Sequence, residues 1–410
     1  MAASFLPKAT IAWSRVFALA AVQNAIVLSW VMYRLYLPDL FAQVGLAASV
    51  VGTVLFFEVA IGFILEPLMG YGSDRLRRWT GTRFPLILAG VLLTVVMFFA
   101  LPPIAGLGAA AQSALPLAAV IWAMAMAAFR APVLVMLGQC AMSSGDLPYA
   151  AGVLMAIGAI VGRLIPMTTD FWLSRGAMFT FVSGSVVLLV AIGVLRAVLP
   201  APAPPADPSD PGDELTLDLR HLVVALLRTI AVAVGVIWTG NWFGALVPRL
   251  YAGTELTPWS AASPIQVGLV GAASCLVAAA LGQRFGMRRT IAIAAPIGLA
   301  AILGLSVSGT TALGTLLIVA IVAVQSAINV GVIPLALEIA PPGFGGVAIG
   351  MYFGTLGLAG NAFGKIFGDL SDAAPTSLAQ GGAFALLLVA LGFGLQLWPT
   401  TRPELENLQE

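Results

Sequence analysis

Two charged residues, Glu58 and Arg130, stand deep inside long apolar stretches of a chain in which only 9% of residues are charged. At the 1.5 Å rise of a helical residue, Glu58 lies about 18 Å from Gly70 and Arg130 about 12 Å from Gly138. An ionisable group buried in a membrane faces the protein interior and commonly belongs to a substrate or proton pathway. The two side chains therefore predict either a substrate or proton site or a structural ion pair, and their similar depths would let them meet.

Four side-chain amides also fall near the middle of apolar stretches. Gln23 and Asn24 are adjacent in the first stretch, and Gln325 and Asn329 lie in the tenth. The last two are four residues apart, so they share one face of a helix. These amides are candidates for a substrate site, although hydrogen bonding between helices would also account for them.

An aromatic pair is the third candidate. Trp238 and Trp242 flank Asn241, an arrangement that could stack on and hydrogen-bond to a sugar ring. Their position near the outer end of the seventh apolar stretch also suits an aromatic belt at the membrane surface. Both interpretations stay open on the sequence alone.

The densest group of charges lies between the second and third apolar stretches, in "EPLMGYGSDRLRRWTGTRFP". Six charged residues occupy eighteen positions there: Glu66, Asp74, Arg75, Arg77, Arg78 and Arg83. The pattern predicts a short turn outside the membrane. The arginines could anchor this turn at anionic lipid headgroups.

Composition decides the class of protein. Hydrophobic residues make up 60% of the chain, and its mean hydropathy of +1.02 predicts that a bilayer is its solvent. A net charge of +1 without a basic stripe argues against a nucleic-acid partner. Two distant cysteines and one histidine give no metal or disulfide pattern, and we expect no cofactor. We see no Ser–His–Asp set or phosphate loop, so we do not expect an enzyme.

The elements that must position these residues are membrane-spanning helices. We expect an all-α polytopic membrane protein with twelve spans in two halves of six. The spans are predicted near 11–36, 44–70, 84–103, 112–138, 147–168, 176–198, 221–248, 262–282, 288–308, 311–337, 346–368 and 380–400. The halves are residues 1–198 and 221–400, joined by a Pro- and Asp-rich linker at 199–220 and followed by a tail at 401–410. The N-terminus is expected to be a retained first span and not a signal peptide.

Positive charge predicts the orientation. With both termini in the cytoplasm, twelve lysines and arginines fall in cytoplasmic segments and only Arg34, Arg175 and Arg249 in outer ones. We therefore expect cytoplasmic termini and, as the membrane, the inner membrane of a bacterium. The cluster around Asp74 then faces the cytoplasm.

The same cluster carries a family resemblance. "G-Y-x-S-D-R" followed by "G-x-R" resembles the loop between spans two and three of the major facilitator superfamily, at the positions Gly70, Asp74, Arg75, Gly81 and Arg83. The longer "EPLMGYGSDR…GTRFP" is similar to the sugar–cation symporter and sucrose-transporter branch, and to the bacteriochlorophyll-delivery group of light-harvesting assembly proteins. The segment "GQRFGMRR", residues 282–289, echoes the loop in the second half but lacks its aspartate.

The resemblance implies a cytoplasmic gate. In proteins of this fold the acid of the loop faces the N-terminus of span eleven, which here would set Asp74 against the helix start near Gly345. Gly70, Arg75 and Arg83 would belong to the same gate. Span eleven also carries a stripe of glycines that permits close helix packing, at 346, 350, 354, 360, 364 and 368.

The leading functional hypothesis is a secondary transporter that moves a small solute by alternating access. Protons or Na⁺ are the candidate coupling ions, and Glu58 is the only carboxylate predicted to lie deep in a span. We expect a monomer in the bilayer. The alternative is a membrane assembly or pigment-handling factor that uses the same fold without transporting.

Overall fold

A computed structural model describes residues 11–141, 146–201, 219–250, 264–308, 312–341, 343–370 and 372–394. Regular structure within these residues is helical, with one isolated β-bridge between Ile11 and Ala141. The expected linker and tail lie almost wholly outside the described residues, so their predicted roles stay predictions.

Twelve segments of the described chain are helical, long and apolar enough to cross a bilayer, as the sequence predicts. The helices of the first half are α1 (Trp13–Gln43), α2 (Ala48–Thr80), α3 (Phe84–Ala105), α4 (Ala114–Val135), α5 (Leu147–Leu164), α6 (Thr169–Arg175) and α7 (Ala177–Val198). Those of the second half are α8 (Leu219–Leu250), α9 (Pro264–Phe285), α10 (Met287–Ser308), α11 (Ala312–Ile339), α12 (Gly345–Phe367) and α13 (Pro375–Gly394). The fifth span runs from α5 through a short 3₁₀ turn into α6.

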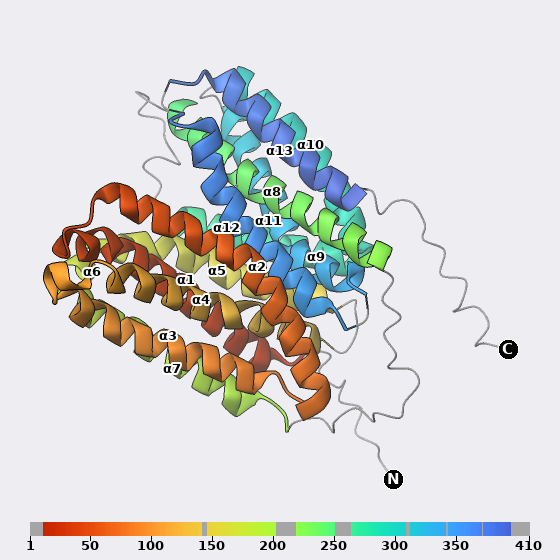
Figure 1. The fold of residues 1–410 in the computed structure, drawn as a ribbon. Coiled ribbons are helices and arrows are strands. Elements are labelled where there is room, and N and C mark those ends of the chain that lie inside the picture. The colour runs from red at the N-terminus through yellow and green to blue at the C-terminus, as the bar shows by residue number, and fades with distance from the viewer. Residues whose placement is uncertain are drawn as a thin grey trace, which may run out of the picture.

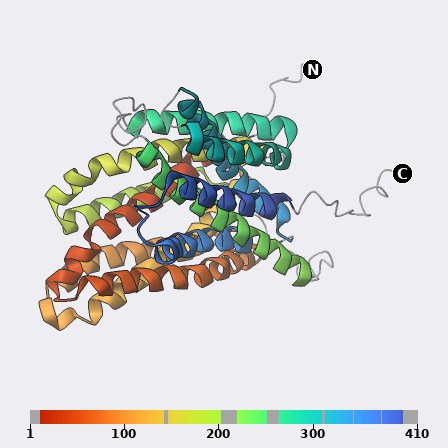
Figure 2. The same cartoon turned by 90° about the horizontal axis from the view of Figure 1, so that it is seen from above.

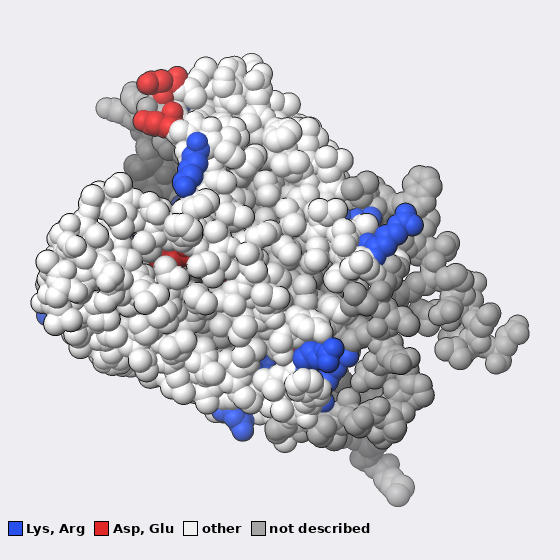
Figure 3. Space-filling model, viewed as in Figure 1, with Lys and Arg blue, Asp and Glu red and all other residues white. Residues whose placement is uncertain are grey.

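The helices form two bundles that lie side by side, α1–α7 and α8–α13 (Figures 1 and 2). Two helix pairs make the most extensive contacts between them: α2 packs along α12, and α5 packs along α9. Most charged side chains of the visible face lie near its ends, and the broad region between them is almost wholly uncharged apart from a small acidic patch in a hollow (Figure 3). This region suits a bilayer, and the two seams are the surfaces along which the bundles contact each other.

Helix α2 is longer than predicted. It continues without a break through Pro67 and Gly70 to Thr80, and it ends where Gly81 adopts a positive φ of 73°. Gly81 supplies the left-handed conformation that commonly ends a helix. The charged segment is therefore mostly helix, and only Gly81 to Arg83 forms the turn.

Glycines bring α2 and α12 into backbone contact. A Cβ atom added to Gly346 or Gly350 would overlap the backbone of Gly70 or Glu66, and one added to Gly354 would crowd Phe63. The first three glycines of the predicted stripe thus do allow close helix approach. The outer three do not contact α2: Gly360 faces α8, and a Cβ on Gly364 or Gly368 would meet open space.

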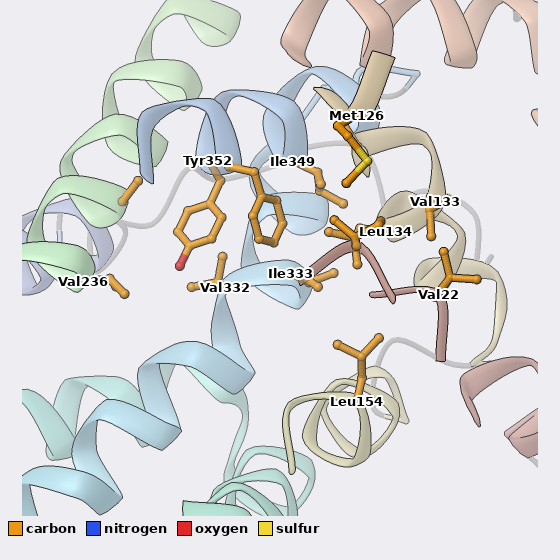
Figure 4. Close-up of a cluster of buried hydrophobic side chains, with 14 of the residues drawn as sticks. Val22, Met126, Val133, Leu134, Leu154, Val236, Val332, Ile333, Ile349 and Tyr352 are labelled. Atoms are coloured by element: carbon orange, nitrogen blue, oxygen red, sulfur yellow. The ribbon is translucent and has the colours of Figure 1, made fainter. Parts of the chain in front are cut away.

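A cluster of apolar side chains fills the space between the bundles (Figure 4). Val22, Leu134 and Leu154 come from α1, α4 and α5, while Ile333 and Ile349 come from α11 and α12. All five are at most 2% exposed. We call this group the apolar seal, because it excludes water where the two halves meet.

Candidate functional site

A cavity of about 270 Å³ lies between α1, α2 and α4 of the first half and α12 of the second. We call it the polar cavity. Its polar and charged lining comes from the first half, whereas α12 contributes Phe353, Gly354 and Gly357. The charged or amide side chains that line it are Gln23, Arg34, Glu58, Glu66 and Arg130.

Glu58 is held by an aromatic cluster. The Tyr33 hydroxyl donates a hydrogen bond to Glu58 Oε1, and the carboxylate side chain is buried. Tyr33 is fully buried and stacks on Trp122 with ring centroids 4.1 Å apart, while Trp30 packs edge-on against both rings. Because packed rings fix the hydroxyl, they also fix the acid that it contacts.

Arg130 forms its ion pair with Glu66, so of the two alternatives left open by the sequence the Glu58–Arg130 ion pair is wrong. Arg130 Nη2 donates to Glu66 Oε1, and the guanidinium lies 5.2 Å from the ring centre of Phe353 on α12. Glu66 is buried, which makes it a second carboxylate deep in a span beside Glu58. The error follows from grouping Glu66 with the charged turn, although residue 66 falls inside the predicted second span, 44–70.

A signal for Glu66 was present in the sequence. Glu58, Gly62 and Glu66 are spaced by four residues, which places all three on one helix face if the helix continues. All three line the polar cavity. The predicted span 44–70 includes all three residues, so their spacing already indicates two acids on the interior face of α2.

Several polar atoms around the cavity have no hydrogen-bond partner in the described part of the chain. They are Gln23 Oε1, Glu58 Oε2, Glu66 Oε2 and Arg130 Nε. Buried polar groups are normally paired, and unpaired ones at a cavity indicate capacity for a ligand or water.

The predicted amide candidates separate into two places. Gln23 lines the polar cavity, but Asn24 donates to the Ala20 carbonyl of its own helix at 2.7 Å. Gln325 lines a different cavity of about 420 Å³ between α5, α8, α9 and α11, and Asn329 lies one turn further along α11. The structure therefore brings only Gln23 to the acids of α2.

The tryptophan pair packs within the second half. Trp238 Nε1 donates to the Ala359 carbonyl of α12 at 2.9 Å, and its ring meets Phe367 edge-on. Trp242 is buried against Phe363 and Phe367. Asn241, between them, is half-buried. Since these rings contact α12 and not the acids, the structure gives them a packing role.

The contact expected for Asp74 is present. Asp74 Oδ2 accepts a hydrogen bond of 2.8 Å from the backbone N–H of Gly346 in the first turn of α12, and Oδ1 pairs with Arg83 at 2.5 Å. Asp74 and Arg83 are both buried. Gly70 lies against Gly346 in the same contact, whereas Arg75 is exposed and bonds to the Tyr71 hydroxyl. Three of the four predicted gate residues thus meet at the seam.

A second polar contact crosses the other seam at the same end. Gln283, in the echo of the loop motif, donates to Asp146 just before α5 at 3.1 Å. In the second copy, which lacks the aspartate, Gln283 contacts an acid across the seam from a different position of the motif. A cavity of about 920 Å³ separates the two contacts and is lined by both halves.

The apolar seal lies between the polar cavity and the Asp74 contact. Leu134 is four residues beyond Arg130 on α4, and Ile349 is three residues beyond Gly346 on α12. The Asp74 end of the seam is thus closed by a hydrogen bond, by glycine packing and by a buried apolar layer.

Comparison with known proteins gives the wider context. The family model described as Major Facilitator Superfamily matches residues 19–365. No curated protein sequence matches. Solved structures with the same fold include a bacterial homologue of the iron transporter ferroportin in the outward-facing state, with a TM-score of 0.66 and 14% identity over 93% of this chain and 98% of that one.

Two further structures match over similar lengths. The human organic anion transporter MFSD10 (TETRAN) gives a TM-score of 0.64 at 16% identity, covering 94% of this chain and all of the other. The transporter FucP in its outward conformation gives 0.62 at 14% identity, covering 93% and 98%. At such identities these similarities concern the fold alone.

Proposed function

The chain belongs to the major facilitator superfamily and is an integral multi-pass membrane protein, and from this premise we propose that it is a secondary transporter. It moves a small solute by alternating access, with the two helix bundles rocking about a site between them. The observation that carries the proposal is the polar cavity, in which buried acids of one half face a glycine surface of the other.

The seams support such a motion. A rocking transporter needs contacts that are strong enough to close one end and few enough to release it. The contacts at the Asp74 end meet this need, because one hydrogen bond, one cross-seam amide and an apolar layer hold it. Opening at this end would break the bond between Asp74 and Gly346.

We assign the Asp74 end to the cytoplasm. The assignment rests on the excess of arginine in the segments at this end, including Arg75, Arg78, Arg284 and Arg289. Both termini are then cytoplasmic, and the state described here is closed toward the cytoplasm. We further propose that the protein is a monomer and that its membrane is the inner membrane of a bacterium.

For coupling, Glu58 is the proposed proton carrier. Its Oε1 is bonded to Tyr33 and its other oxygen has no partner among the described residues, so the group lacks a fixed counter-ion contact. Glu66 differs, because its ion pair with Arg130 favours a fixed charge. Na⁺ is the alternative coupling ion at the same carboxylate.

Solute counterflow in proteoliposomes tests the proposal. Vesicles with purified protein, preloaded with an unlabelled solute, should accumulate the labelled form transiently, and vesicles with a Glu66→Gln/Arg130→Met variant should accumulate less. Repeating the uptake measurement with an imposed pH gradient or Na⁺ gradient then identifies the coupling ion. Absence of counterflow for every solute, together with co-purification of pigment or nascent complexes, would replace transport with the assembly-factor function.

A further inference from the structure

A second cavity crosses the other seam between the two halves. It has a volume of about 420 Å³ and lies between α5 of the first half and α8, α9 and α11 of the second. None of the described residues that line it also lines the polar cavity. We call it the apolar cavity, because its walls are mostly aliphatic side chains, glycines and the ring of Phe243. Its size falls within the range of small-molecule sites in proteins.

Arg163 is the only charged residue among the described residues that line the apolar cavity. It lies in the last turn of α5, and its guanidinium has no ion pair or hydrogen bond with the part of the chain that the structure describes. The side chain is exposed, so water can solvate its charge without an acidic partner. A cation beside apolar walls attracts an anion more strongly than it would in bulk water, because the local dielectric constant is lower.

The polar groups of the apolar cavity lie close together beside the α5–α9 seam. Ser326 donates to the Gly271 carbonyl at 3.5 Å. A Cβ atom on Gly271 would contact Ala159, which is one turn before Arg163 on the same face of α5. Gln325 donates at 3.5 Å to a carbonyl oxygen of α8. Both bonds are longer than usual, so these two donors can turn toward an oxygen of a ligand.

Helix α8 leaves space beside these groups. Gly240 and Gly244 line the apolar cavity one turn apart, and a Cβ atom added to either would meet no atom within 4 Å. Phe243, between them, lines the same cavity. A flat ring suits this surface, because it can pack against the phenylalanine while the glycines leave its face unobstructed.

We propose that the apolar cavity binds a small aromatic carboxylate. The carboxylate pairs with Arg163 and accepts hydrogen bonds from Gln325 and Ser326, while the ring lies against Phe243. A guanidinium can bind a planar carboxylate through two parallel hydrogen bonds, which favours this group over a neutral one. Because α5 belongs to one half and the other walls to the second, the bound carboxylate contacts both halves. The site goes beyond the proposed function, since it is separate from the polar cavity.

Three ligands that share one ring system test the chemical class. Isothermal titration calorimetry on the full-length protein in phosphatidylcholine nanodiscs compares naphthoate, the uncharged naphthamide and the cationic naphthylmethylammonium. Naphthoate should bind about tenfold more tightly than naphthamide or better, since hydrogen bonds between ionised groups are the stronger ones. The cation should give no more heat than it gives with protein-free nanodiscs. Equal affinity for naphthamide, preferential binding of the cation, or no binding of naphthoate overturns the inference.

A matched pair of arginine variants locates the ion pair. Arg163→Gln removes the charge and should weaken naphthoate binding about tenfold or more, with little effect on naphthamide. Arg175→Gln is the control, because Arg175 lies in the last turn of α6, contacts the Phe171 ring and does not line the apolar cavity. Unchanged naphthoate affinity in the Arg163→Gln variant, or an equal loss in both variants, contradicts the assignment.

A second pair tests the location without changing charge. The side chain introduced by Gly244→Leu enters the apolar cavity and should abolish naphthoate binding. Gly193→Leu on α7 is its control, since a Cβ there also meets no atom within 4 Å and Gly193 does not line the cavity. If the Arg163→Gln variant does not fold, the glycine pair still decides, because naphthoate binding that survives Gly244→Leu places the ligand elsewhere and overturns the inference.

This site and the transport function fail separately. Naphthoate binding without counterflow of any solute would keep the carboxylate site and remove the transporter proposal. Counterflow in a protein that does not bind naphthoate would keep the transporter and overturn the carboxylate site.

Discussion

The ion pair of Glu66 and Arg130 should show strong coupling in a double-mutant cycle. Removing one partner of a buried pair leaves an uncompensated charge and costs about 3–5 kcal/mol. Glu66→Gln and Arg130→Met should each lower stability strongly, and the double variant should lose much less than their sum. Denaturant unfolding of the purified protein measures the cycle.

The matched control uses the other acid. Glu58 bonds to Tyr33 and not to Arg130, so Glu58→Gln and Arg130→Met should be additive to within about 0.5 kcal/mol. Coupling between Glu58 and Arg130 larger than that between Glu66 and Arg130 would contradict the pairing described here.

Glu58→Gln should separate binding from energetic coupling. The amide keeps an oxygen that accepts from Tyr33 but cannot take up or release a proton at working pH. We therefore expect exchange of solute to persist and uphill accumulation to be lost. Tyr33→Phe, which retains the acid, should accumulate solute at a reduced rate. Gradient-driven accumulation by the Glu58→Gln protein would eliminate this carboxylate as the proton carrier.

At this scale the sequence predicted which residues are buried better than which residues meet. Glu58, Arg130 and Gln23 were recognised as interior, because a charge or amide in an apolar stretch stands out by composition alone. Which side chains form pairs depends on the register between neighbouring helices. A shift of two helical turns exchanges one partner for another. Glu66 was missed for a different reason, because it was grouped with the charged turn.

At the scale of helices, the contact between α2 and α12 depends on where glycine stands. Gly350→Ala should destabilise the protein or separate the seam, because the added Cβ meets the backbone at Glu66 and Pro67, which cannot move aside. Overpacking of this kind costs about 1–3 kcal/mol. The melting temperature should fall by several degrees.

Gly364→Ala is the control on the same helix. Its Cβ would point into open space, and replacing a helical glycine by alanine gains up to about 1 kcal/mol. The melting temperature should be unchanged or slightly higher. Equal effects of the two substitutions would mean that the glycine stripe does not set the helix approach.

The twelve helices were predictable because each needs only a long apolar stretch. The ends of these helices were harder to predict. Pro67 and Gly70 are both signals for ending a helix, yet α2 runs on to Thr80. Gly70 stands within the helix because the backbone of α12 packs against it and leaves no room for a side chain. Tertiary contact here outweighs local preference.

At the scale of the whole molecule, alternating access requires that the polar cavity is closed toward one side of the membrane while it is open toward the other. The apolar seal and the Asp74 contact lie on the same side of the polar cavity, so both should open together. Thiol labelling can follow this motion because the native cysteines are buried, and burial raises the pKa of the Cys140 thiol to about 11. A thiol with so little thiolate reacts slowly, which keeps the background low.

Asp74→Asn should shift the protein toward the state that is open at the Asp74 end. The substitution removes the charge that faces the N-terminus of α12 across the seam, an interaction worth about 1–2 kcal/mol and hence roughly a five- to thirtyfold change in population. A Leu134→Cys reporter in the apolar seal should then label faster from that side. A Gly357→Cys reporter in the polar cavity should label more slowly from the opposite side, since a rigid rocking motion couples the two ends. Unchanged labelling rates at both reporters would leave Asp74 with a structural role and Arg75 to Arg83 as headgroup anchors. A changed rate at only one reporter would show that the halves do not move as rigid bodies.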